Sequence, residues 1–324
     1  MARPRKSQQF SKPQPVARGE RTRARGRRLP ERIGVLLERE ASPDFELVDF
    51  GGGRKLERYG ALVIDRPEGQ AIGSRCLDAR EWKRADAVFT GDTDEEGAGR
   101  WSKPDRVGET WRLERDGVAF HGRFTSFRHV GVFPEQAPHW DLARTLVREA
   151  DRPVRALNLF GYTGVASLLM AQAGAQVTHV DASKRAVGWA RENAALAGLA
   201  DKPIRWLVDD AMKFCAREVR RGNTYDIIMA DPPSFGRGPK GEVWQFFDDA
   251  PHLLDLLRAL QSPQPLMTVV TSYAIRASHL AVHELMQECF AGLSGTIESG
   301  EMILRDRAGR ALSTSMFSRV LGPR

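Results

Sequence analysis

The chain has 324 residues, of which 41% are hydrophobic and 28% are charged, so it can bury one large core or two smaller ones. No apolar run approaches the ~18 residues of a membrane-spanning helix, and the N-terminus lacks the apolar centre of a secretory signal. Cys76, Cys215 and Cys289 are odd in number and widely spaced, which argues against a disulfide framework or a metal site. We expect a soluble, cytoplasmic protein of two folded domains.

Residues 1–32 carry most of the positive charge. They contain eleven arginines and lysines but only two glutamates, a net charge of +9, so the rest of the chain contributes −2 to the total of +7. Few apolar residues accompany these charges, and such a segment cannot build a core. We predict a disordered basic tail that contacts the phosphates of RNA, with a merely solvated arm as the alternative.

Residues 33–127 alternate between apolar and polar side chains over short runs that turn residues interrupt. The runs at 45–50, 61–64, 110–113 and 118–124 are typical of strands, and they predict a small β-rich domain that could bind the substrate or RNA. The polar run 91–97 is predicted to be a surface loop. Its carboxylates have no second cluster to complete the coordination of a metal ion.

From about residue 139 the pattern changes to alternating strands and helices, which is typical of a parallel sheet with crossover helices. We predict strands over 154–160, 176–180, 204–208, 225–230 and 266–271. Helices are expected over 165–173 and 184–197, the second with Ser183 as its N-cap. The fold class is therefore α/β, with residues 128–324 forming the larger domain.

A turn with two glycines follows the first of these strands and leads directly into a helix. It reads Asn158-Leu159-Phe160-Gly161-Tyr162-Thr163-Gly164, and glycines allow a ligand to approach the backbone closely. The next strand ends at Asp181, 23 residues after Asn158, near the interval of about 20 residues at which a carboxylate accepts hydrogen bonds from ribose. Together these features predict an adenosine-containing ligand. A plain tight turn with a helix cap, or a dinucleotide fold, remains the alternative.

The most specific motif is Asp231-Pro232-Pro233-Ser234-Phe235, which follows the fourth strand of this domain. Two successive prolines remove two backbone donors, so Asp231 and neighbouring carbonyls can accept a hydrogen bond from a substrate N–H. Phe235 can stack on a base. Methyl transfer needs little more than a lone pair held in line with the methyl group, and this loop suits that requirement.

These motifs together resemble the class I methyltransferase family that includes the bacterial 23S rRNA large-subunit methyltransferases, over roughly residues 128–320. The loop from Asp231 to Trp244 resembles that of a bacterial subgroup. The resemblance implies a Rossmann-like domain, S-adenosylmethionine as the methyl donor, an RNA substrate, and catalytic roles for Asp231, Pro232, Pro233 and Phe235. It also implies that the donor contacts Gln136, Asn158, Phe160, Gly161, Tyr162, Thr163, Gly164, Asp181, Ala182, Ser183, Asp210 and Ala211.

One departure from the family concerns the methylated atom. Family members that methylate carbon 5 of cytosine use a cysteine in the loop after the fifth strand, whereas this chain has Thr271-Ser272-Tyr273 there. Cytosine C5 chemistry needs such a thiolate. We therefore expect methylation of a nitrogen atom in a ribosomal RNA base. A small-molecule methyltransferase, a non-catalytic RNA-binding relative and an oxidoreductase are the alternatives, and the sequence predicts no oligomeric state.

Overall fold

A computed structural model describes residues 26–91, 99–273 and 275–323. The predicted basic tail lies largely outside these residues, and so does most of the predicted loop 91–97. Among the described residues, no helix is long and apolar enough to cross a membrane.

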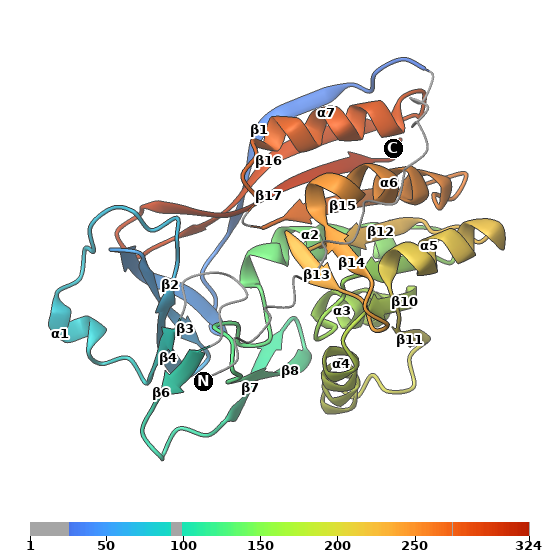
Figure 1. The fold of residues 1–324 in the computed structure, drawn as a ribbon. Coiled ribbons are helices and arrows are strands. Elements are labelled where there is room, and N and C mark those ends of the chain that lie inside the picture. The colour runs from blue at the N-terminus through green and yellow to red at the C-terminus, as the bar shows by residue number, and fades with distance from the viewer. Residues whose placement is uncertain (1–25, 92–98, 274, 324) are drawn as a thin grey trace, which may run out of the picture.

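An eight-stranded sheet forms the centre of the molecule (Figure 1). Its middle strands are parallel, while β17 runs antiparallel to both of its neighbours. The strand order reverses between β9 and β12, because the chain passes from β9 to β10 and β11 on one side and then returns to β12 and β15 on the other. In sheet order the strands are β1 (Glu31–Arg39), β16 (Thr296–Arg305), β17 (Ala311–Leu321), β15 (Met267–Ser272), β12 (Ile227–Ala230), β9 (Arg155–Leu159), β10 (Gln176–Asp181) and β11 (Ile204–Val208).

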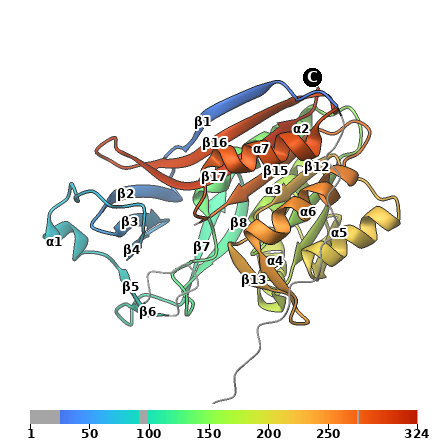
Figure 2. The same ribbon diagram turned by 45° about the horizontal axis from the view of Figure 1, so that its top comes forward.

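Helices cover both faces of this sheet (Figure 2) and bury two apolar clusters. One face packs against α2 (Ala137–Glu149), α3 (Val165–Ala173) and α4 (Lys184–Leu196), and the other against α5 (Ala211–Arg220), α6 (Phe246–Ala259) and α7 (His279–Phe290). The middle strands are buried on both sides and therefore read as nearly continuous apolar runs. The predicted α/β domain with its parallel sheet is confirmed.

A separate five-stranded sheet lies toward the N-terminus (Figure 1), as the β-rich pattern predicted. It consists of β2 (Phe45–Gly51), β3 (Arg54–Tyr59), β4 (Leu62–Pro67), β5 (Ala87–Gly91) and β6 (Gly99–Ser102), with the short helix α1 (Ala79–Trp82) between β4 and β5. A hairpin of β7 (Thr110–Arg115) and β8 (Val118–Arg123) follows and contacts α4, where the backbone N–H of His121 donates to the side chain of Asn193 at 2.9 Å. The 3-10 turn η1 (Pro134–Gln136) then leads into α2.

The N-terminal boundary differs from the expected one at residues 32 and 33. Leu29 is buried, and β1 pairs in parallel with β16 at the edge of the large sheet rather than joining the small one. The partners are about 265 residues apart, as Glu31 opposite Ile297 illustrates. Only the long-range pairing could have assigned this strand, because its local pattern suits either sheet.

The pairing of β1 with β16 requires a glycine at position 300, where the two backbones lie very close together. A Cβ atom on Gly300 would lie 1.8 Å from the carbonyl oxygen of Val35, whereas a Cβ on Gly188 in α4 would meet nothing within 4 Å. We expect Gly300→Ala to lower the free energy of unfolding by about 1–3 kcal/mol or more, since β1 must move. Gly188→Ala, the control, should be neutral or stabilising by about 0.5–1 kcal/mol. Urea unfolding measures both, and equal stabilities would contradict the pairing.

Candidate active site

A cavity of about 430 Å³ opens where the parallel strands end, beside the point at which their order reverses. Open α/β sheets bind their ligands at this position. The lining brings together six segments of the sequence, and aromatic and carboxylate side chains dominate it. The lining residues include Phe127, His129, Phe133, Phe160, Tyr162, Asp181, Ala182, Ser183, Asp210, Ala211, Asp231, Pro232, Pro233, Trp244 and Tyr273. A smaller cavity of about 60 Å³ adjoins it and shares Phe133, Phe160, Tyr162 and Asp231.

The turn between β9 and α3 has an unusual backbone. Phe160 and Tyr162 have φ angles of +56° and +50°, in the left-handed region that residues with a Cβ seldom adopt. The turn is held by the backbone N–H of Gly161, which donates to the Val180 carbonyl at 3.1 Å, and by that of Tyr162, which donates to the Asp181 carboxylate at 2.9 Å. Strain of this kind persists only where the surroundings enforce it, and it is common at ligand sites.

Packing inside the protein requires the two glycines of this turn, and Gly161 also lines the smaller cavity. A Cβ on Gly161 would lie 2.5 Å from the ring of His179, and one on Gly164 would lie 2.9 Å from Ala190. Gly164 also has a φ angle of +81°. Both residues are needed because other parts of the protein lie directly against them.

Buried polar side chains support the turn from below. The Asn158 amide donates to Ser167 Oγ at 2.9 Å, and Ser167 Oγ lies 3.0 Å from Nδ1 of His179. Burial lowers the pKa of His179 to about 3, so its ring is neutral. Thr163 fixes the turn to a more distant segment, because its hydroxyl donates to the Gly131 carbonyl at 2.6 Å. Asn158 and Thr163 line the smaller cavity.

The Asp181 carboxylate holds the backbone around it and also faces the cavity. It accepts from the backbone N–H groups of Tyr162 and Ser183, at 2.9 and 2.8 Å, and it also lines the larger cavity. Burial raises the pKa of this carboxyl, and the two backbone donors oppose the rise. Ser183 is the N-cap of α4, as predicted, with its hydroxyl accepting from the Ala186 N–H at 3.2 Å.

Asp210 likewise caps a helix and faces the cavity. It is the N-cap of α5 and accepts from the Lys213 N–H at 2.9 Å, while Asp210 and Ala211 both line the cavity. Burial raises the pKa of the Asp210 carboxyl. One side chain therefore both caps a helix and lines the cavity. The sequence alone could not show that Asp210 does both.

The Asp231 carboxylate is positioned by side chains from two other segments. The Thr271 hydroxyl at the end of β15 donates to it, and the Gln136 amide donates to Thr271 at 3.1 Å. Gln136 lies in η1 and lines the smaller cavity. This chain of hydrogen bonds joins the segment before the sheet to the Asp-Pro-Pro loop.

A hairpin of β13 (Phe235–Arg237) and β14 (Val243–Gln245) follows Pro233 and decides which aromatic side chain faces the cavity. Trp244, opposite Gly236, is buried at the cavity, and its indole N–H donates to the Pro233 carbonyl at 2.7 Å. Phe235 does not line the cavity and is 37% exposed. Side chains alternate between the two faces of a hairpin, so Phe235 lies on the opposite face from Trp244, and its expected contact with the substrate stays a prediction.

Two further aromatic residues of the cavity were not predicted. Tyr273 donates from its hydroxyl to the buried carboxylate of Glu135, and Phe133 packs against the Tyr273 ring at a centroid distance of 5.4 Å. Burial and the nearby Glu135 raise the pKa of Tyr273 well above its ordinary value, so the hydroxyl keeps its proton. Tyr273 lies just beyond a predicted strand end, which was the only available signal for it.

Three described residues lie close enough together to bind a metal ion, but an arginine already forms ion pairs with two of them. Asp49, Cys76 and Asp306 lie close together away from the cavity. The Arg310 guanidinium lies 2.6 Å from the Asp49 carboxylate and 2.7 Å from that of Asp306. The two carboxylates therefore share the Arg310 guanidinium as their cation.

Comparisons with known proteins assign the fold and this cavity to a family. A sequence model described as S-adenosylmethionine-dependent methyltransferase matches residues 88–280. A crystal structure of an S-adenosylmethionine-dependent methyltransferase from Agrobacterium tumefaciens is 53% identical, covers 94% of this chain and 98% of its own, and superposes with a TM-score of 0.89. This chain belongs to the S-adenosylmethionine-dependent methyltransferases.

More distant proteins share the fold or part of the sequence. A Streptococcus mutans protein described as a methyltransferase is 17% identical, covers 86% of this chain and 76% of its own, and has a TM-score of 0.65. Proteins named ribosomal RNA large subunit methyltransferase K/L from Shewanella baltica and Shewanella oneidensis are 37% identical over 152 residues. That match covers 45% of this chain and 20% of those relatives, so this methyltransferase matches about a fifth of their length.

S-adenosylmethionine is the methyl donor, as the resemblance implied, and the residues at the cavity fit it. Asp181 and Asp210 place carboxylate acceptors at neighbouring strand ends, and such acceptors suit the ribose hydroxyls and the adenine amino group of this donor. Phe160 and Tyr162 add aromatic walls to both cavities.

The position of Asp181 yields a prediction about the donor. We expect Asp181→Asn to weaken S-adenosylmethionine binding roughly 10- to 150-fold, because a charged acceptor contributes about 1.5–3 kcal/mol. Calorimetry with the purified methyltransferase measures the affinity. Asp201→Asn, a substitution of an exposed aspartate in a loop, serves as the control and should leave it unchanged. Equal affinities of the two variants would remove Asp181 from the donor site.

Proposed function

We propose that this methyltransferase transfers a methyl group to a nitrogen atom of a base in RNA, with ribosomal RNA as the first candidate substrate. The observation that carries the proposal is the position of Asp231-Pro232-Pro233, between the carboxylates suited to adenosine and an aromatic wall. A planar heterocycle fits such a wall, and its N–H would meet the acceptors of the loop. This activity would take place in the cytoplasm, where ribosomal RNA is available.

Two further observations support RNA as the substrate. The relatives from Shewanella are named for ribosomal RNA, although they share only part of their length with this chain. The first 25 residues, which lie outside the described part, contain eight arginines and lysines and one glutamate. Such a density of positive charge suits a polyanion better than a small metabolite.

The preference for nitrogen over cytosine C5 is supported by the places of the cysteines. Cys215 and Cys289 are buried in α5 and α7, and the exposed Cys76 lies in the N-terminal part of the chain. None of the three lines the cavity that the described residues form. Burial also raises the pKa of Cys215, which opposes formation of a thiolate.

Methylation of nitrogen requires this chain mainly to orient its substrates. When bound, S-adenosylmethionine supplies an electrophilic methyl group on a sulfonium sulfur. Thr271 fixes the carboxylate of Asp231, and Trp244 fixes the carbonyl of Pro233, so the loop presents acceptors in set directions. A substrate N–H that donates to these acceptors holds the nitrogen lone pair toward the donor, which is the main contribution to the rate.

The methylated atom can be tested directly. We expect nucleosides from ribosomal RNA treated with the enzyme to contain an N-methylated base by mass spectrometry, and replacement of all three cysteines by serine to leave substantial activity. Asp231→Asn should strongly reduce kcat with little change in donor affinity, because it acts in the transition state. A product of 5-methylcytosine would refute nitrogen methylation. Transfer only to a metabolite fraction would refute an RNA substrate.

The role of the basic tail is tested by removing residues 1–25. We choose this limit because the Arg27 carbonyl accepts from Gly292 and Leu29 is buried, so a longer deletion would disturb the fold. The truncated protein should bind RNA more weakly, and its affinity should depend less on salt, by about 0.7 in the logarithmic slope for each phosphate that the tail neutralises. Filter binding between low and high salt measures this. Identical slopes would mean that the tail does not contact phosphates.

A further inference from the structure

The wall of the cavity opposite the sheet is formed by a connecting segment, residues 125–129, between β8 and η1. Phe127 and His129 of this segment both line the cavity. Phe127 is 42% exposed, which is unusual for so large an apolar side chain. The other aromatic residues of the lining are more deeply buried, so Phe127 is the one most available to an incoming substrate.

The backbone of this segment is anchored to the N-terminal five-stranded sheet. The Trp101 indole N–H on β6 donates to the Phe127 carbonyl at 3.1 Å. Arg66 on β4 donates to the Arg128 carbonyl at 3.4 Å, and the Arg128 guanidinium returns a hydrogen bond to the Pro67 carbonyl at 3.2 Å. On the other side of Phe127, the Gly99 N–H on β6 donates to the Ser126 carbonyl at 2.9 Å, so the N-terminal sheet holds the segment at both neighbours of Phe127.

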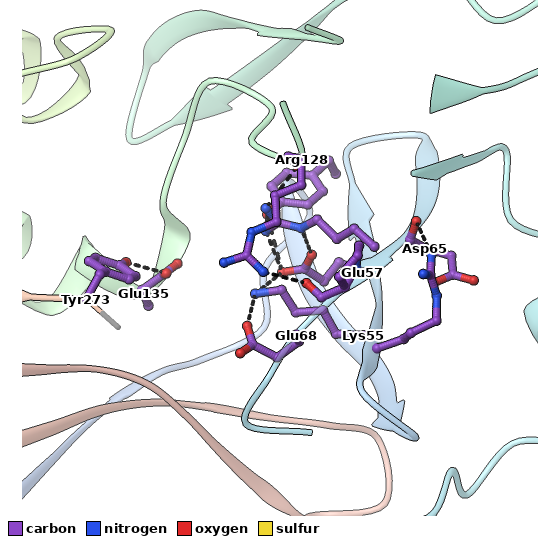
Figure 3. A network of polar contacts seen from close by, with 11 residues as sticks. Lys55, Glu57, Asp65, Glu68, Arg128, Glu135 and Tyr273 are labelled. Atoms are coloured by element: carbon purple, nitrogen blue, oxygen red, sulfur yellow. Dashed lines mark hydrogen bonds and ion pairs between the residues drawn. The ribbon is translucent and has the colours of Figure 1, made fainter. Parts of the chain in front are cut away.

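Arg66 is itself fixed by a buried ion network (Figure 3). Its guanidinium donates to the Glu57 carboxylate at 2.5 and 3.0 Å and to the Tyr59 hydroxyl at 2.7 Å. Lys55 lies 3.5 Å from Glu57 and 3.1 Å from Glu68. Burial opposes ionisation of Glu57, yet Arg66 and Lys55 hold the pKa of its carboxyl below the ordinary value.

A buried ion pair of this kind contributes little to stability on balance, because removing the charges from water costs about as much as their attraction returns. Its effect here is geometric. Glu57 and Tyr59 orient the Arg66 side chain toward the Arg128 carbonyl, and this contact helps to hold residues 127–129. Figure 3 shows Glu135, whose carboxylate accepts a hydrogen bond from Tyr273 of the cavity, to the left of the network.

We propose that the N-terminal sheet builds the acceptor side of the active site, with Phe127 as the face on which the substrate base stacks and Arg66 as the positioning residue that holds Phe127 in place. The identity of the stacked group rests on the proposed function. In this proposal the N-terminal domain contributes to substrate selection by shaping the cavity. It does not need an RNA-binding surface of its own.

The stacking face is tested by varying Phe127, whose exposed side chain contributes little to the core. With ribosomal RNA and methyl-labelled donor, Phe127→Ala should raise KM for RNA about tenfold or more, since stacking on a base contributes roughly that much. The affinity for S-adenosylmethionine should not change, and Phe127→Tyr should restore KM. An unchanged KM in Phe127→Ala, or a failure of Phe127→Tyr to restore it, would overturn the stacking role.

The positioning role is tested with two matched arginines of the same sheet. Arg54 pairs with Asp65 at 2.6 Å, donates to the Phe89 carbonyl at 3.0 Å and does not line the cavity, so Arg54→Lys is the control for Arg66→Lys. Backbone amides of residues 125–129 should exchange with deuterium faster in Arg66→Lys and at the wild-type rate in Arg54→Lys. Should Arg66→Lys fail to fold, Tyr59→Phe removes one hydrogen bond of Arg66 and should give the same change to a smaller extent.

These measurements separate the inference from the proposed function. Exchange at residues 125–129 is measured without substrate, so it reports on Arg66 whether or not RNA is methylated. If the wild-type enzyme transfers no methyl group to RNA, the proposed function and the stacking of a base fail together, while the exchange data still decide the positioning role. Equal exchange in the two arginine variants would overturn the positioning role even if RNA is the substrate.

Discussion

The turn between β9 and α3 is the constraint on which the rest of the active site depends. Two residues with side chains, Phe160 and Tyr162, adopt left-handed backbone angles there, at a cost of about 1–3 kcal/mol each. The hydrogen bonds from Gly161 to Val180 and from Tyr162 to Asp181 balance that cost. Because both acceptors belong to β10, the turn can keep its shape only when β9 and β10 pair in the observed register. The donor site and the parallel sheet therefore form together.

Several side chains of the site perform a structural and a chemical role at once. Asp181 and Asp210 satisfy backbone N–H groups at the starts of helices while also lining the cavity. Each carboxylate oxygen has two lone pairs, so a backbone contact leaves capacity for a ligand. A helix cap and a ligand contact are thus compatible, and the presence of one is no argument against the other.

The cavity is lined by three different parts of the fold. The sheet supplies carboxylates at its strand ends, the hairpin of β13 and β14 supplies Trp244, and the segment before η1 supplies Phe127 and His129. The family match that begins at residue 88 includes the last two strands of the small sheet, β5 and β6. Trp101 on β6 contacts Phe127, so this part of the N-terminal domain and the cavity are physically continuous.

The sequence by itself determined the features that are encoded locally. The alternation of strands and helices, the Ser183 cap, the turn from Asn158 to Gly164 and the family resemblance all depend on residues close together in the chain, and the structure agrees with them. Donor specificity followed from the same motifs, because loop and carboxylate stand at the ends of adjacent strands.

Only the tertiary structure decided the features that depend on distant contacts. The edge position of β1 requires pairing with β16, the need for a glycine at 161 comes from His179 on a neighbouring strand, and the wall at Phe127 is held by Arg66. The placement of Trp244 rather than Phe235 in the cavity lining has a related reason. A hairpin presents alternate side chains to opposite faces, and which face meets the cavity is set by packing against the rest of the protein, as in the contact of Trp244 with Phe160.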